Sequence, residues 1–248
     1  MEKPLRIAEL RRRLRVLEGF GEGSEGLGRP RAGAVGLGIP AIDGVLPGGG
    51  LAAGSLHEVT GSAHDAAAQG FAAALLGRIA HGEAPLLWCR ATGRGADPGA
   101  PYAPGLERFG IAAARVVFVE VRRRDDALWA MEEGLRASGL AAVYGEGIEL
   151  DLTTSRRLQL AAESTGKTAL ALLSSRRAAP ITAATTRWRV TALPSLACDG
   201  GPRPRWRIEL VRCRGGNPDR WIVEWNDATL HFDLASPLVD GLLATSAG

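Results

Sequence analysis

The sequence contains few of the residues from which metal sites and disulfides are built. Among its 248 residues are three cysteines and four histidines. The cysteines stand far apart, no two of them in a C-x-x-C spacing, and the histidines do not complete a ligand set with them. The sequence therefore predicts neither a zinc site nor a disulfide framework, and we expect no metal and no cofactor.

Long hydrophobic runs are also missing. No apolar stretch is long enough to cross a membrane, and residues 1–19 lack the apolar core of a signal peptide. Hydrophobic residues still make up 46% of the chain, which is enough for one substantial core. We expect a cytoplasmic protein with one α/β domain over 33–235, a basic helix and Gly-rich linker over 1–32, and a tail over 236–248.

Lysine is almost absent. The only two lysines are Lys3 and Lys167, and the other Lys and Arg positions are all arginine. The net charge is nevertheless only +3. A phosphate loop needs a lysine that neutralises phosphate charge, so its lysine would have to be Lys167 or the terminal Lys3. Arginine runs such as those at 11–13, 122–124 and 156–157 could contact nucleic acid, although such runs are more often solvated faces.

One stretch has the letters of a loose phosphate loop. Residues 161–168 read A-x-x-x-x-G-K-T. A working loop follows a strand and opens a helix. Here the pattern predicts the reverse order: a helix capped by Thr153 or Thr154, a stop at Gly166, and a buried strand over Thr168–Leu173. We therefore favour a helix end at which Lys167 lies near the C-terminal dipole, over a phosphate site.

The centre of the chain alternates strand and helix patterns, which is typical of an α/β domain with a mostly parallel sheet and helices on both faces. In chain order the predicted elements are strand 55–60, helix 71–80, strands 85–89 and 116–121, helix 125–138, strand 140–144, a helix from 153 or 154, and strand 169–173.

The last third has a different pattern. Short β-branched or aromatic segments at 187–193, 206–212, 221–225 and 229–232 are separated by turn residues. They predict antiparallel strands that extend one side of the parallel sheet. Four tryptophans fall in these segments, and alternating tryptophans in strands favour core packing over stacking on nucleic acid bases.

Two stretches carry a family resemblance. Gly38–Leu51 (GIPAIDGVLPGGGL) and Gly54–Gly61 (GSLHEVTG) resemble the entry to the RecA core, where such a segment leads through a strand into the phosphate loop. The resemblance implies that the loop begins at Gly61. The sequence continues S-A-H-D-A-A-A-Q-G without Gly-Lys-Thr, so a degenerate loop is expected, with vestigial positions Gly61, Ser62, Asp65, Ala67 and Gln69. ATP hydrolysis there is improbable, because the lysine and the Mg²⁺-binding hydroxyl are missing and Asp65 adds negative charge.

Other RecA-like positions are altered too. Where a RecA-type enzyme places its catalytic glutamate after the second strand, this sequence reads Cys89-Arg90-Ala91-Thr92. Glu146 stands at the expected end of the fourth strand, in the place of the metal-holding acid. The segments that carry DNA in RecA, here after Glu146 and after Ser175, are short, which argues against a filament-forming recombinase.

A closer resemblance is to the ImuA family. Leu46–Leu51, Leu56–Val59 and the long stretch Glu146–Glu163 are similar to it, and the similarity covers 33–232. It implies a RecA-like, non-catalytic adaptor in SOS-induced translesion synthesis, nucleoid-associated, with contacts to the polymerase-like ImuB subunit and further contacts to RecA and the associated error-prone DNA polymerase.

The candidate contact residues lie on two helices: Leu10, Arg13, Leu14 and Leu17 near the N-terminus, and Arg156 and Arg157 on the helix that precedes Gly166. On that second helix we expect Leu158 and Leu160 to pack on the sheet and the two arginines to face outward. Two alternatives remain open: a DNA-stimulated ATPase that uses Lys167, and a cell-division inhibitor of the SulA type, which is RecA-like without a working phosphate loop.

Overall fold

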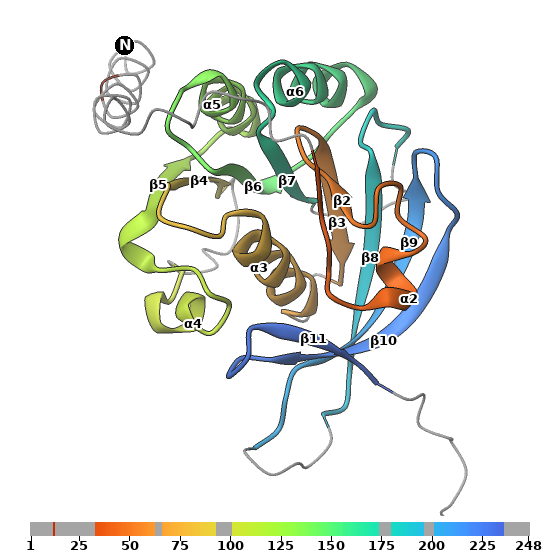
Figure 1. Ribbon diagram of the computed structural model, residues 1–248. Coiled ribbons are helices and arrows are strands. Elements are labelled where there is room, and N and C mark those ends of the chain that lie inside the picture. The colour runs from red at the N-terminus through yellow and green to blue at the C-terminus, as the bar shows by residue number, and fades with distance from the viewer. Residues whose placement is uncertain are drawn as a thin grey trace, which may run out of the picture.

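The structure is a computed structural model that describes Arg12 and residues 33–62, 66–92, 101–173, 180–195 and 201–235 (Figure 1). One large mixed sheet of nine strands forms its centre. The parallel strands, in sheet order, are β5 (Val116–Val121), β4 (Leu86–Ala91), β6 (Ala142–Ile148), β7 (Thr168–Leu173), β3 (Leu56–Gly61) and β8 (Thr186–Leu193). The expected mostly parallel α/β sheet is confirmed.

Helices cover both faces of this sheet, as expected (Figure 1). On one face lies α3 (Ala67–Ile79), whose buried residues pack with Trp88 and Tyr144. On the other lie α5 (Arg124–Arg136) and α6 (Leu152–Thr165), which pack with Leu87 and Val143. Neighbouring residues of a strand point to opposite faces, so these nearly continuous apolar strands fill two cores. Between β4 and β5 the chain forms α4 (Ala103–Glu107) and a short 3₁₀ turn (Ala113–Arg115).

The segment before β3 is held by one carboxylate. Asp43, at the end of α2 (Pro40–Asp43), accepts hydrogen bonds from the backbone N–H groups of Leu37 and Gly38 at 2.6 and 2.9 Å. A small separate sheet of β1 (Ala34–Val35) and β2 (Leu51–Ala52) closes this segment. Leu37, Ile42 and Leu51 are buried in the core on the α3 side, so the entry segment is part of the domain.

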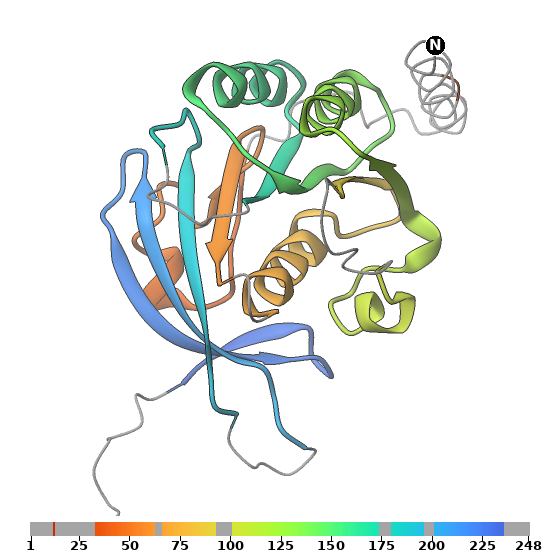
Figure 2. The same cartoon turned by 180° about the vertical axis from the view of Figure 1, so that it is seen from behind.

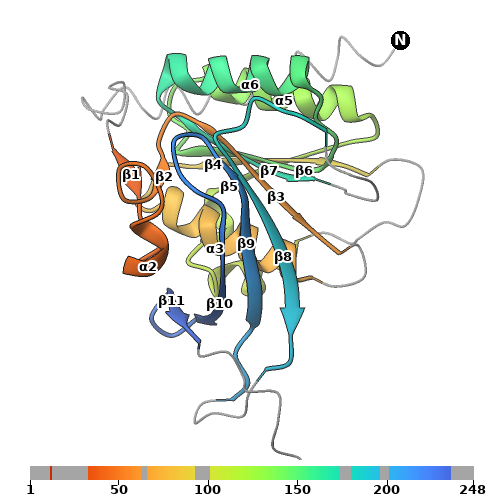
Figure 3. The same cartoon turned by 90° about the vertical axis from the view of Figure 1, so that its right-hand side faces the viewer.

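Three strands extend the sheet beyond β8: β9 (Arg205–Cys213), β10 (Asp219–Asn226) and β11 (His231–Leu234). They are antiparallel to their neighbours, as predicted. The prediction was wrong for β8, which pairs parallel with β3 and is antiparallel only to β9. It is therefore the junction between the two parts of the sheet (Figure 3).

The tryptophans of these strands lie in the core. Trp188, Trp206 and Trp225 are at most 4% exposed, and Trp221 packs against the same cluster. Their rings contact one another and Phe71 of α3, with a Phe71–Trp188 centroid distance of 5.7 Å. The preference for core packing over base stacking is confirmed. In the part of the chain that the structure describes, no helix is long and apolar enough to span a membrane.

Candidate functional site

The junction of β3 and α3 has the order that a phosphate loop requires. The strand ends at Gly61 and the helix begins at Ala67, so the expected entry at Gly61 is followed by a helix. Of the other vestigial positions, Ser62 and Gln69 are exposed, and Asp65 lies outside the described residues.

Alanines occupy the positions on which phosphate chemistry depends. In a G-x-x-x-x-G-K-[ST] loop that begins at Gly61, the lysine would stand at 67 and the hydroxyl at 68. Ala67 and Ala68 are 5% and 2% exposed, so their side chains face the core. A Cβ on Gly61 would lie 2.5 Å from the Cβ of Ala68, which shows how closely strand and helix approach here. At these two described positions the junction is packed as core, with alanine in place of the lysine and of the metal-binding hydroxyl.

Glu146 is held by two neighbours on β4. Its Oε2 accepts hydrogen bonds from Trp88 Nε1 at 3.0 Å and from Arg90 Nε at 3.1 Å. The guanidinium of Arg90 lies 5.3 Å from the centre of the Phe118 ring, and the side chains of Arg90 and Glu146 are 5% and 12% exposed. The expectation that Glu146 ends its strand was wrong, because β6 continues to Ile148 past an irregularity in the pairing.

This cluster has a clear electrostatic consequence. A buried carboxylate that is already neutralised by a guanidinium has little net charge left with which to attract Mg²⁺. Burial, with Glu146 nearby as a second cause, raises the pKa of Tyr144 well above its ordinary value, so this phenol is neutral. Within the described residues no group of three or more His, Cys, Asp or Glu side chains could hold a metal.

Lys167 stands between a helix and a strand, in the order opposite to that of a phosphate loop. Helix α6 ends at Thr165, Gly166 takes the left-handed conformation with φ of 71°, and β7 starts at Thr168, so the helix, glycine, strand order is confirmed. The helix start was predicted wrongly, because Asp151 is the cap and Thr154 completes a reciprocal capping box with it. Lys167 directly follows the C-cap of α6, and its Nζ donates to the backbone carbonyl of Leu135 near the end of α5 at 3.3 Å.

A cavity of about 550 Å³ lies at the other end of α3. Arg78 and Arg115 line it together with Phe109 and Trp225. Both arginines donate to backbone carbonyls: Arg78 to Gly36 at 2.8 Å, and Arg115 to the carbonyls of Ala80 and Ala84. These cations therefore hold loops together, and the cavity is separate from the β3–α3 junction.

Comparison with known proteins identifies the family. The protein named ImuA of Caulobacter vibrioides, found in two strains, is 35% identical over 238 residues, and the match covers 86% of this chain and 93% of the relative. The chain belongs to the ImuA family. No family model matches it. The ImuA resemblance expected from Leu46–Leu51, Leu56–Val59 and Glu146–Glu163 is thereby confirmed.

In this ImuA-family protein, the candidate contact helix α6 presents a mixed face to solvent. Arg156 and Arg157 are exposed and Leu158 is buried, as expected. The expectation for Leu160 was wrong, since it is 53% exposed. Leu152, two turns before Leu160, is 54% exposed, and the sequence did not single it out. The other candidates, Leu10, Arg13, Leu14 and Leu17, lie outside the described residues.

The partner of Glu146 was not foreseen from the sequence of this ImuA-family chain. Arg90 was noted only as a departure from the RecA pattern, and its contact with Glu146 depends on the cross-strand register that places the two residues opposite each other. A charged residue inside the apolar run LLWCRA is the signal that points to a buried ionic partner.

Proposed function

We propose that this protein is a non-catalytic RecA-like adaptor in SOS-induced translesion DNA synthesis. It acts by protein contacts with a polymerase-like ImuB subunit, and RecA and the associated error-prone DNA polymerase are its further partners. Family membership supports the assignment to the ImuA system. The single observation that carries the non-catalytic part is the pair of buried alanines, Ala67 and Ala68, at the lysine and hydroxyl positions of the loop.

The ionic cluster supports the same proposal. A RecA-type ATPase neutralises γ-phosphate charge with a lysine and Mg²⁺. Here the candidate acid Glu146 binds Arg90 within the protein, and Lys167 Nζ binds the carbonyl of Leu135. In this proposal the fold serves as a rigid scaffold that presents its surface helices to partners.

The exposed face of α6 is the surface we assign to the partner. Leu152, Arg156 and Leu160 are spaced by four residues and so lie along one side of the helix. Arginine is enriched at protein interfaces, and apolar side chains at helical spacing are what a partner groove or helix buries. Arg157 is held to Glu132 of α5 at 2.7 Å, whereas Arg156 makes no ion pair within the described residues. The face therefore suits an amphipathic partner helix whose apolar side chains flank a carboxylate.

The test is co-purification of the ImuB-type partner with a Leu152→Ala/Leu160→Ala variant. Loss of two exposed anchors should weaken partner binding by about tenfold or more. Folding should be unaffected, because exposed substitutions change stability by about 0.5 kcal/mol or less. Leu158→Ala, which truncates a buried neighbour, should instead destabilise by about 2–5 kcal/mol.

Tyr102→Ala is the matched control, because Tyr102 is 74% exposed and lies next to α4 instead of α6. Undiminished partner binding in the double variant, or an equal loss in the Tyr102 variant, would remove α6 from the proposal. Deletion of residues 1–19 tests the second predicted contact, through Leu10, Arg13, Leu14 and Leu17, in the same assay. Capture of FtsZ in place of a polymerase-like protein would identify the SulA-type function.

A further inference from the structure

Strands β8, β9 and β10 have one face in the core and one face over which none of the described residues forms a helix (Figure 2). The inward residues include Trp188, Trp206 and Trp225. In the view from behind, these cyan and blue strands lie in front, and none of the described helices is drawn over them (Figure 2). The side view gives the same picture, with α5 and α6 confined to the neighbouring part of the sheet (Figure 3). We call this side the outer face: Arg189, Thr191, Arg207, Glu209, Arg220 and Ile222, which are opposed in register across the three strands.

Positive charge is concentrated in this part of the chain. Residues 186–195 and 201–226 contain eight arginines, no lysine and three acids, for a formal charge of +5. The whole chain carries +3, so the remainder has a formal charge of −2. Some of these arginines are bound to acids elsewhere in the chain, as Arg187 is to Glu58 and Arg214 to Glu163. On the outer face itself, three arginines and Glu209 leave a formal charge of +2, which creates a local positive potential.

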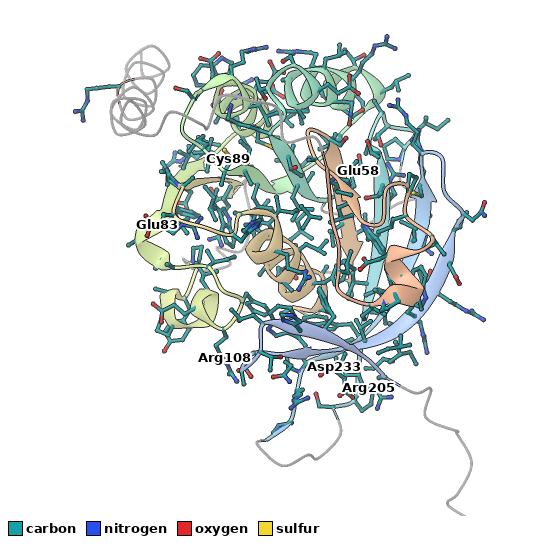
Figure 4. The ribbon with its side chains drawn as sticks, in the orientation of Figure 1. Glu58, Glu83, Cys89, Arg108, Arg205 and Asp233 are labelled. Carbon is teal, nitrogen blue, oxygen red and sulfur yellow. The ribbon has the colours of Figure 1, made fainter. Side chains whose placement is uncertain are left out.

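Two of the three acids of these strands are bound to arginines, and the third, Asp219, accepts the backbone N–H of Arg220 at 2.7 Å. Glu209 pairs with Arg189 at 3.1 Å and Glu224 with Arg205 at 3.7 Å. Arg207 and Arg220 are exposed, and neither forms an ion pair within the described part of the chain. Asp233 of β11, which is labelled in Figure 4, is bound by Arg203 at 3.2 Å.

We propose that the outer face binds duplex DNA through its phosphates. Arginine is the side chain best suited to phosphate oxygens, and phosphate contacts need no apolar anchor. Among the described residues of β8, β9 and β10, Val211 is the one large apolar side chain that is exposed, at 37%, whereas a protein interface needs a buried apolar centre.

The tryptophan side chains of these strands point into the core, which favours duplex over single-stranded DNA as the ligand. Proteins that bind single strands stack the bases on exposed aromatic rings. All four tryptophans of β8 to β10 pack against the core instead, so the outer face offers guanidinium groups without a stacking surface. Binding should therefore be independent of base sequence and strongly dependent on salt. This inference goes beyond the adaptor function, since it concerns a different surface from α6 and a different ligand.

The experiment measures binding of the full-length protein to a short fluorescent duplex of arbitrary sequence, and to one of its separated strands, by anisotropy between about 50 and 200 mM salt. We compare the wild type with Arg207→Gln/Arg220→Gln. The control is Arg122→Gln/Arg123→Gln, which removes the same charge from two exposed arginines at the start of α5. Thermal unfolding of each variant verifies that the fold is intact.

The expected result is duplex binding that weakens by about tenfold or more in the Arg207/Arg220 variant, with a slope of log K against log salt that is smaller by about two. Binding of the control should match the wild type. An unchanged slope in the Arg207/Arg220 variant, an equal loss in the control, or tighter binding of the single strand than of the duplex would overturn the proposal. A wild type that does not bind the duplex, together with an Arg207/Arg220 variant that loses the ImuB-type partner, would also overturn the proposal. The outer face would then be a protein interface. The α6 variant separates the two proposals, since it should lose the partner and keep the duplex.

Discussion

His57 lies on β3 and connects this strand with its neighbours. Its Nε2 lies 2.9 Å from the carbonyl oxygen of Ala52, which accepts, so this nitrogen carries the hydrogen. Its Nδ1 then accepts from the hydroxyl of Thr186 at 2.8 Å, and that hydroxyl accepts from Trp188 Nε1 at 3.1 Å. Both ring nitrogens are thus satisfied in the neutral form, and protonation would place two donors face to face.

Burial lowers the pKa of His57 from 6.5 to about 4. In the unfolded chain the ring binds a proton at higher pH than in the folded protein, so the stability conferred by the neutral ring is present above about pH 6.5 and is lost as the pH falls toward 4. We expect about 3 kcal/mol of unfolding free energy to be lost over this range. Urea unfolding as a function of pH measures this loss of unfolding free energy. His57→Gln, which cannot titrate, should be less stable at neutral pH but should lose less on acidification. An identical pH dependence in both proteins would contradict this account.

Single residues also set a limit on what the sequence could predict. Glu146 was found by its place after an apolar strand, but Arg90 neutralises it because β4 and β6 are paired in one particular register. Residues 56 positions apart in the chain have no local pattern in common. The pairing of this acid with Arg90 was therefore visible only in three dimensions.

At the scale of elements, the β3–α3 junction depends on close approach of strand and helix. A methyl group on Gly61 would lie 2.5 Å from Ala68 Cβ and 3.0 Å from the carbonyl oxygen of Val190. We expect Gly61→Ala to destabilise the fold by about 1–3 kcal/mol through overpacking. Gly33→Ala is the control, because nothing lies within 4 Å of the added carbon. The midpoint of chemical denaturation measures both. Equal midpoints for the two variants would mean that the junction is looser than the structure indicates.

Helix α6 shows which features of a helix its sequence pattern can predict. Its existence and its end at Gly166 were predicted, since capping and breaking residues act locally. Its buried side was not predicted fully. Leu158 and Leu160 are two residues apart, which is about 200° around a helix, so both cannot face the same sheet. The structure buries Leu158 and exposes Leu160. Hydrophobicity alone did not distinguish a core residue from a candidate anchor.

At the scale of the whole molecule, the order of strands and helices followed from local patterns, and the sheet extension at the C-terminal end did too. The direction of β8 did not. Strand β8 has a parallel neighbour on one side and an antiparallel neighbour on the other. Its eight residues carry no sequence pattern that shows this, because the direction of a strand is set by the connection that precedes it. The outer face was likewise hidden, since the predicted extension did not say which strands the helices would leave uncovered.

The central claim is that the RecA-like core of this ImuA-family protein works as a scaffold without phosphate-loop chemistry. Calorimetric titration with ATP, in the presence of Mg²⁺ and DNA, tests it on the wild type and Lys167→Ala side by side. We predict no nucleotide binding in either protein, because the lysine and hydroxyl positions are buried alanines and Lys167 binds the carbonyl of Leu135. Tight ATP binding by the wild type that is lost in Lys167→Ala would contradict the claim and make residues 161–168 a nucleotide site.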